Sequence, residues 1–132
     1  MDTTKGKVKA VCISEKKGTA KRDIGKGFFR QDFGLEGDSH AGSQRQVSIL
    51  RIESVADNRI KSGDYGENLV VQGMKSIPVG ARIRIGETLL EVTQLGKKCH
   101  TDCEIRRLTG DCIMPREGIF ARVMRSGWIK TG

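Results

Sequence analysis

Residues 77 to 95 read Ile77-Pro-Val-Gly-Ala-Arg-Ile-Arg-Ile-Gly-Glu-Thr-Leu-Leu-Glu-Val-Thr-Gln-Leu95, and the architecture of the chain follows from this pattern. Arginine and isoleucine alternate from position 82 to 85, which is the period of a half-buried β-strand. A second apolar run covers 88–95, and the Gly86-Glu87 pair between the two runs is typical of a hairpin turn. The pattern therefore predicts two antiparallel strands joined by a tight turn.

Similar short runs rich in Val, Ile and Phe occur elsewhere in the chain, separated by turn residues. They predict further strands over 7–14, 21–29, 45–50, 66–73 and 119–130, the last divided at Ser126-Gly127. Apolar spacing predicts short helices over 52–60 and 103–110. A chain of 132 residues can bury roughly two thirds of its unfolded surface, so a single domain over 1–132 is expected. Many short strands interrupted by 17 glycines predict a mainly β, compact, barrel-like fold with one or two short helices.

The overall charge predicts an anionic partner, because the formal net charge is +8 and the pI is near 9.6. The basic residues are scattered in pairs, and the chain has one Trp and one Tyr, which argues against a base-stacking nucleic-acid surface. Four cysteines are too few for a disulfide scaffold, and the sequence has neither an apolar signal segment nor an apolar run of bilayer length. These features predict a cytoplasmic protein with reduced thiols and no membrane contact.

Cys99 is the leading candidate for a reactive residue. The strand over 88–95 delivers it through Gly96 to a loop, and loops at strand ends are where scaffolds expose chemistry. Lys97 and Lys98 precede it directly, and positive charge beside a thiol favours the thiolate. Free cysteines are otherwise often buried as small apolar residues, and this interpretation is kept for Cys12 and Cys112 and stays open for Cys103.

The glycine-dense stretch from Phe33 to Gly42 predicts an ordered loop. Its glycines permit positive φ and a close approach of the backbone to a ligand, as at Gly37. Asp38 and His40 could cap the loop or ligate a metal, and for His40 a hydrogen bond within its own loop is the alternative. Because this loop and Cys99 are both polar strand-end segments, we expect them to share one pocket.

The order of motifs along the chain resembles the MOSC family, the domain found at the C-terminus of molybdenum-cofactor sulfurases. The motifs that carry the resemblance are Gly34-Leu-Glu-Gly-Asp-Ser-His-Ala-Gly42, Arg45-Gln-Val-Ser-Ile-Leu50, Gly66-Glu-Asn-Leu-Val70, Pro78-Val-Gly-Ala-Arg-Ile-Arg-Ile-Gly86, Leu90-Glu-Val-Thr-Gln94, Cys-His-x-x-Cys at 99 to 103 and the stretch from Gly110 to Phe120. Together they cover most of the chain and look like the small, stand-alone bacterial branch of the family.

The resemblance implies a β-rich, barrel-like fold and a role in molybdenum-cofactor metabolism. Cys99 stands at the position of the family cysteine that carries sulfur as a persulfide or holds molybdenum, and Cys103 is a further metal candidate. Molybdopterin bears a phosphate, which basic side chains near the motifs would favour. The cofactor-binding residues implied in this way are Gly37, Asp38, His40, Arg45, Asn68, Lys98 and Arg116.

Partners and one alternative follow from the same resemblance. The pyridoxal-phosphate half of the larger sulfurases has no counterpart here, so no pyridoxal-phosphate site is expected. The resemblance then implies that a separate protein donates the sulfur and that a molybdoenzyme or a cofactor-biosynthesis protein receives it. One alternative is a molybdenum-dependent oxidoreductase that reduces N-hydroxylated compounds. Another, argued from ligand spacing, is a structural zinc site made by Cys99, His100, Cys103 and Cys112.

Overall fold

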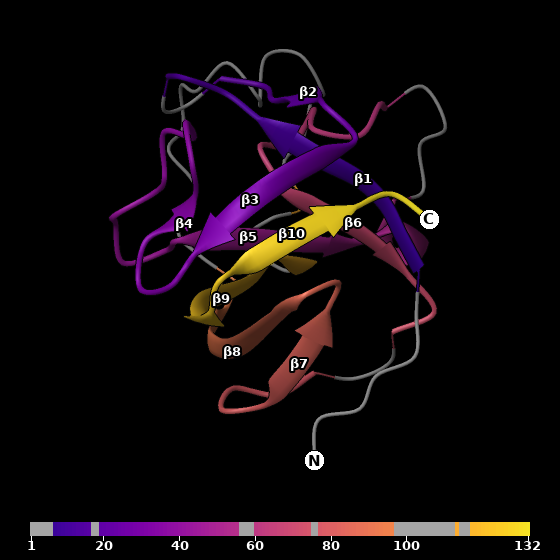
Figure 1. Cartoon of the computed structure of the whole chain (residues 1–132). Coiled ribbons are helices and arrows are strands. Elements are labelled where there is room, and N and C mark those ends of the chain that lie inside the picture. Colours follow the sequence, from indigo (N-terminus) through magenta and orange to yellow (C-terminus); the bar gives the residue numbers. More distant parts are fainter. Residues whose placement is uncertain (1–6, 17–18, 56–59, 75–76, 97–112, 114–116) are drawn as a thin grey trace.

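The computed structural model describes residues 7–16, 19–55, 60–74, 77–96, 113 and 117–132, in which ten strands form two sheets (Figure 1). Every strand predicted above is confirmed in position, although the strand predicted over 21–29 is divided into two short strands. The strands are β1 (Lys7–Ile13), β2 (Arg22–Asp23), β3 (Lys26–Arg30), β4 (Gly34–Leu35), β5 (Val47–Arg51), β6 (Leu69–Gln72), β7 (Arg82–Ile85), β8 (Thr88–Leu95), β9 (Ile119–Arg125) and β10 (Gly127–Lys130).

The predicted hairpin is made by β7 and β8, with Ile85 opposite Thr88 and a two-residue turn between them. Ile83 and Ile85 are buried whereas Arg82 and Arg84, which alternate with them, are exposed, as the alternation requires. Gly86 has a φ of +56°, and a Cβ on it would lie 2.6 Å from the backbone oxygen of Trp128. Glycine is therefore needed in this turn both for its conformation and for the close approach of β10.

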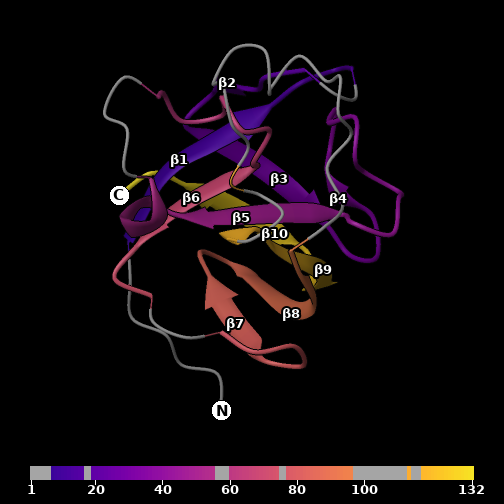
Figure 2. The same ribbon diagram turned by 180° about the vertical axis from the view of Figure 1, so that it is seen from behind.

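The larger sheet has seven strands in the order β2-β1-β6-β5-β9-β8-β7. Its β5–β6 pair is parallel and the other pairs are antiparallel. The smaller sheet has the order β10-β3-β4, and it lies across the larger one (Figure 2). Within the described residues the terminal strands β2 and β7 of the larger sheet do not pair with each other. The mainly β prediction is confirmed, but the sheet does not close into a barrel, so "barrel-like" is only a loose description.

One principal core lies between the two sheets and joins them. Phe29 and Ile129 of the smaller sheet are fully buried in the same apolar cluster as Ile49, Leu69 and Leu90 of the larger sheet. Fully burying a side chain of this kind contributes roughly 1.5–3 kcal/mol. The core therefore fixes the smaller sheet to the larger one, although few backbone hydrogen bonds connect them.

The helix predicted over 52–60 is corrected by the structure. In the described part of this range, 52–55 and 60, Ile52–Ser54 forms a short 3-10 helix, and Val55 is extended, with φ −93° and ψ 104°. Ile52 and Val55 are partly buried in separate clusters, Ile52 beside Cys12 and Val55 beside Leu50, and do not share one helical face. The helix predicted over 103–110 lies outside the described residues. Among the described residues, no helix has the length and apolar character needed to cross a membrane.

Candidate functional site

The glycine-rich loop after β3 is ordered, as predicted. Gly34, Gly37 and Gly42 all have positive φ, at 122°, 91° and 80°. A Cβ on Gly34 would lie 2.7 Å from the backbone oxygen of Gln46, so side chains are excluded there. These turns bring Asp38 against Ser14, the residue that follows β1.

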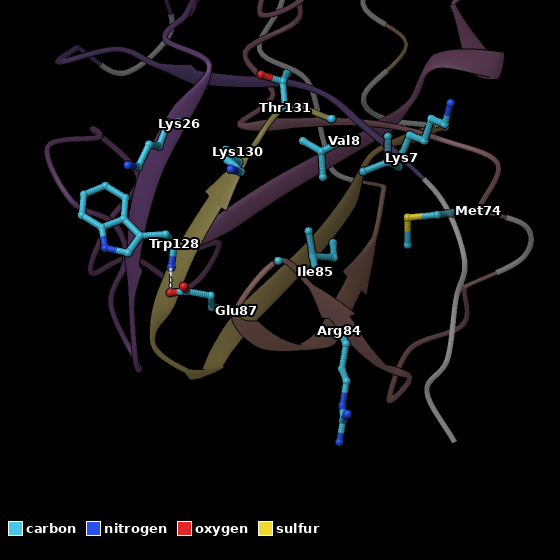
Figure 3. Close-up of a pocket in the computed structure, with 13 residues that line it drawn as sticks. Lys7, Val8, Lys26, Met74, Arg84, Ile85, Glu87, Trp128, Lys130 and Thr131 are labelled. Carbon is cyan, nitrogen blue, oxygen red and sulfur yellow. Dashed lines mark hydrogen bonds between the residues drawn. The ribbon is translucent and has the colours of Figure 1, made fainter.

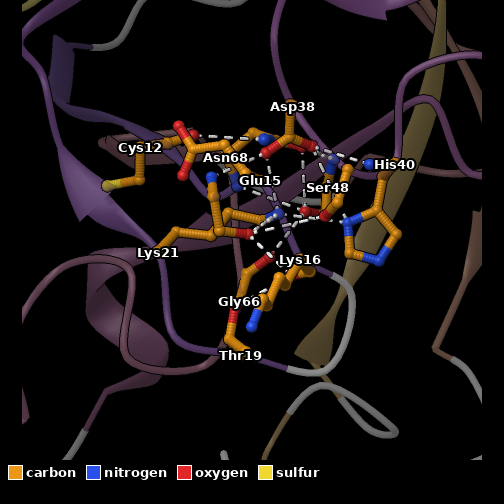
Figure 4. A network of polar contacts seen from close by, with 12 residues as sticks. Cys12, Glu15, Lys16, Thr19, Lys21, Asp38, His40, Ser48, Gly66 and Asn68 are labelled. Atoms are coloured by element: carbon orange, nitrogen blue, oxygen red, sulfur yellow. Dashed lines mark hydrogen bonds and ion pairs between the residues drawn. The ribbon is translucent and has the colours of Figure 1, made fainter.

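Asp38 and Lys21 form a buried ion pair at the centre of this region (Figure 4). The Lys21 Nζ atom lies 2.8 Å from Asp38 Oδ1, and the side chains of both residues are fully shielded from solvent. The same ammonium donates to Ser14 Oγ at 3.1 Å and contacts His40 Nδ1 at 3.1 Å. Asp38 Oδ1 also accepts the Ser14 backbone N–H, at 3.0 Å. All three protons of the ammonium therefore have partners, which a buried charge requires.

The environment shifts the pKa of both partners downward. Burial alone would raise the pKa of Asp38, but the neighbouring His40, the hydrogen bond from Lys21 and the lysine charge hold it well below its ordinary value. Burial lowers the pKa of Lys21, and its bond to Asp38 partly offsets that effect. We interpret the pair as carboxylate and ammonium, because each is surrounded by groups that stabilise the charged form.

His40 connects this pair to the surface. Its Nδ1 lies 3.1 Å from the Lys21 ammonium, which can only donate, so Nδ1 acts as the acceptor and the proton of the neutral ring is assigned to Nε2. The distance of 3.7 Å from Nδ1 to Asp38 Oδ2 is too long for a competing hydrogen bond. The His40 side chain is 26% exposed, and its outer nitrogen points away from the cluster (Figure 4). The cluster therefore presents one N–H donor outward.

A cavity of about 360 Å³ lies beside this cluster and is lined by residues 13–16 and 19–22, which include Ser14 and Lys21. An exposed ion pair between Glu15 and Arg22, at 3.0 Å, lies on the same segment. The outward N–H of His40 could donate to an oxygen-rich anion, whereas the Lys21 ammonium is already fully engaged within the cluster. Among the described residues, no group of three or more His, Cys, Asp or Glu side chains could hold a metal ion.

Two further predicted cofactor residues are described by the structure. Arg45 lies near this loop with its guanidinium carbon 5.8 Å from the centre of the Phe120 ring. Asn68 is fully buried, and it accepts from the Ser48 backbone N–H and donates to the Cys12 carbonyl, at 3.0 and 3.1 Å. Asn68 therefore joins the first strand to the parallel pair of the larger sheet. Cofactor binding by either residue stays a prediction.

The thiols divide into one described residue and three that are not. Cys12 is buried as expected, and burial, with the nearby carboxylates Glu67 and Asp23, raises the pKa of its thiol far above the ordinary value. Cys99, Cys103 and Cys112 lie outside the described residues, as do His100, Lys98 and Arg116. The shared pocket of Cys99 and the glycine-rich loop, and the zinc alternative, therefore stay predictions.

Lys21 and Ser14 are the members of the cluster that sequence reasoning missed. Lys21 is one of 24 basic residues, and nothing in its local pattern distinguishes it from a solvated surface lysine. Only the fold brings it to Asp38, 17 positions along the chain. The usable signal was the acidic residue in a glycine-rich loop, because a buried carboxylate requires a cationic or hydrogen-bonding partner.

Solved structures with the same fold are found in several bacteria. The YuaD protein from Bacillus subtilis matches with a TM-score of 0.79 at 22% identity, over 96% of this chain and 92% of that one. YiiM from Geobacillus stearothermophilus matches with a TM-score of 0.74 at 16% identity, over 97% of this chain and 72% of that one. YiiM from Escherichia coli matches with a TM-score of 0.62 at 18% identity, over 94% and 65%. At these identities the likeness shows the fold alone.

A search of curated protein sequences finds no match. The sequence model of the MOSC domain, however, matches residues 36–132, which is most of the chain and includes Asp38 and His40 of the cluster. This match agrees with the fold that the chain shares with the bacterial structures. The chain belongs to the MOSC domain family, which is associated with molybdenum-cofactor-related function.

Proposed function

We propose that this chain acts in molybdenum-cofactor metabolism, where it binds the molybdenum/molybdopterin cofactor or carries sulfur for it through the thiol of Cys99. The proposal is carried by one observation, which is that the match to the family includes a loop whose Asp38 and His40 enclose the buried ammonium of Lys21. A separate protein would donate the sulfur, and a molybdoenzyme or a cofactor-biosynthesis protein would receive it.

The described residues fit an anionic, oxygen-rich group. The Nε2–H of His40 points outward and can donate to a phosphate or oxo oxygen, while Lys21 fixes the ring tautomer from behind through Nδ1. Asp38 accepts the His40 backbone N–H at 3.1 Å and so holds the loop in place. When bound, the cofactor would supply the redox and sulfur-binding chemistry of molybdenum. The chain would supply the thiol, the hydrogen-bond donor and the positive charge.

Sulfur transfer to Cys99 is a balanced exchange. The Cys99 thiolate attacks the terminal sulfur of a donor persulfide, the sulfur–sulfur bond of the donor breaks, and the donor leaves as a thiolate. Cys99 then holds the persulfide, and no net oxidation or reduction occurs. A soft thiolate is equally suited to ligating molybdenum, so one residue could serve either function.

Native mass spectrometry of protein from a molybdate-fed host, before and after incubation with a persulfide donor, tests the proposal. We expect the wild type to gain one sulfur atom or to retain the cofactor, and Cys99→Ser to lose both abilities while staying folded. Cys12→Ser is the matched control, because it should keep sulfur uptake but lose about 1–3 kcal/mol of stability through a buried hydroxyl. Undiminished sulfur uptake by Cys99→Ser would move the site to Cys103. Stable retention of the cofactor by the purified protein would favour the oxidoreductase alternative over a transient carrier.

A further inference from the structure

A second cavity, of about 470 Å³, lies at the other end of β1 from the Lys21 cluster (Figure 3). It is lined by Lys7 and Val8 at the start of this strand, whereas Ser14 of the cluster follows the strand's end. Seven residues of extended chain span roughly 20 Å, so the two regions are well separated. The volume falls within the range of small-molecule sites.

One wall of this cavity is held in place by the β7–β8 turn. The Glu87 backbone N–H donates to the Trp128 backbone oxygen at 3.0 Å. In return, the Trp128 backbone N–H donates to Glu87 Oε1 at 3.0 Å (Figure 3). A Cβ on Gly127 would lie 2.5 Å from the Glu87 Cβ, so the turn and β10 are in contact. The wall is therefore formed before any ligand binds, and the carboxylate of Glu87 is already engaged by a backbone donor.

Two lysines on neighbouring strands line this cavity. Lys26 of β3 and Lys130 of β10 are direct cross-strand partners, and both are exposed and line the cavity. Like charges directly opposite each other on neighbouring strands are destabilising. Neither lysine forms an ion pair with a carboxylate of the described residues, whereas Arg82 and Arg122 share Glu91. A bound dianion would supply the negative charge that this pair of lysines lacks.

Aromatic and apolar residues also line the cavity. Trp128 is 46% exposed, with the Lys26 ammonium 4.7 Å from its ring centre and the Phe28 ring edge-on at 5.3 Å between centroids. Val8, Val71, Met74 and Ile85 contribute apolar groups to the lining. Exposed indole surface and apolar lining suit a flat organic group, whereas the two lysines suit a phosphate.

We propose that this cavity binds a small organic phosphate with an aromatic ring, of the nucleotide type, with its phosphate between Lys26 and Lys130 and its ring against Trp128. Lys7 and Arg84, which also line the cavity, add positive charge at its edge. The site is distinct from the Lys21 cluster, and the proposal does not depend on the function proposed above.

Fluorescence titration tests this site directly, because Trp128 is the single tryptophan of the chain. We expect saturable quenching by adenosine monophosphate and at least about tenfold weaker binding of adenosine and of inorganic phosphate, since each lacks one half of the recognised chemistry. Lys26→Gln and Lys130→Gln should each weaken binding by roughly tenfold, the loss of one charge-assisted hydrogen bond.

Lys9→Gln is the matched control, because Lys9 is an exposed lysine on β1 that does not line the cavity. It removes the same charge and should leave binding within about twofold. The proposal is overturned if adenosine monophosphate does not saturate the signal, or if all three lysine variants weaken binding equally, which would indicate non-specific attraction. Much tighter binding of a single-stranded oligonucleotide would also overturn it in favour of a polymer.

Discussion

Lys21 and Asp38 place two opposite charges in a part of the protein from which solvent is excluded. Withdrawing both charges from water costs several kcal/mol each, and their attraction offsets this only when the remaining donors and acceptors are also satisfied. Ser14 and His40 complete that requirement here. Removing either partner is therefore expected to lower the stability of the fold, since the other would be left as a buried, unpaired charge.

Lys21→Met is expected to lower the free energy of unfolding by about 3–5 kcal/mol, because it leaves the Asp38 carboxylate buried without its ammonium. Adding Asp38→Asn should recover part of that loss by removing the charge. Urea denaturation of the two variants measures both effects. Arg22→Met is the control at the neighbouring position, and its stability should stay near that of the wild type because its ion pair with Glu15 is exposed. A double variant less stable than Lys21→Met would show that the unpaired charge is not the cause.

Only two members of this cluster, Asp38 and His40, could be recognised from the sequence. Asp38 and His40 were predicted because a glycine-rich loop with polar residues is unusual in a chain of packed strands. Lys21 could not be predicted, since its burial depends on the loop reaching the end of β1. Cys99, for which the sequence argument is strongest, lies outside the described residues, so that prediction stays open.

At the scale of elements, the β7–β8 hairpin has two roles. Its alternating side chains supply Ile83 and Ile85 to the core, and its turn supports β10 beside the second cavity. The turn was predictable because a two-residue connection restricts which residues can occupy it. The failed helix prediction over 52–60 shows the opposite case, in which Ile52 and Val55 pack in two separate apolar clusters and not along one helical face.

Gly86→Ala is expected to destabilise the protein more than Gly80→Ala, by roughly 1–3 kcal/mol. Both glycines have positive φ, so both substitutions carry a backbone cost of about 1–2 kcal/mol. A Cβ at Gly86, however, would meet the Trp128 backbone, whereas Gly80 has nothing within 4 Å. Chemical denaturation of the two variants separates the two effects. Equal losses would mean that the turn can move away from β10 without cost.

At the scale of the whole molecule, two buried carboxylates respond to acid in opposite directions. Burial raises the pKa of Glu67 to about 7 from 4.5, although the Gly63 and Tyr65 backbone N–H groups partly oppose the shift. Folded Glu67 therefore holds a proton that the unfolded chain has lost between pH 4.5 and 7, and stability rises as the pH falls through this window. Asp38 has a lowered pKa, so its contribution is lost only below its ordinary pKa of 3.8.

Thermal unfolding of the wild type should accordingly rise in midpoint as the pH is lowered from about 8 to about 5, then fall in stronger acid. Glu67→Gln should flatten the first part of this profile, because the residue no longer titrates. Glu53→Gln provides the control, since the Glu53 carboxylate is exposed, accepts the Gly73 N–H at 2.8 Å and has a lowered pKa. Parallel profiles for wild type and Glu67→Gln would contradict the assignment.

The strands themselves were predictable because their pattern is local, but their partners were not. Nothing in the sequence of β5 indicates that its neighbour β6 runs parallel to it, or that Asn68 joins both to β1. The division into two sheets also depends on packing across the core by residues such as Phe29 and Ile129. The barrel-like expectation came from the many short, glycine-interrupted strands and from the resemblance, neither of which determines whether the terminal strands β2 and β7 pair.

The pairing of β3 with β10 has a consequence for the order of events during synthesis. Gly127 lies opposite Phe29, so a strand made early has as its partner the last strand of the described chain. While the ribosome still covers that last strand, Phe29 cannot be enclosed, and the apolar face it belongs to stays open to water. Contacts between such distant segments also close slowly, because a long loop must be ordered first. The nascent chain therefore exposes this apolar face, a surface on which chains can aggregate, until translation has passed β10.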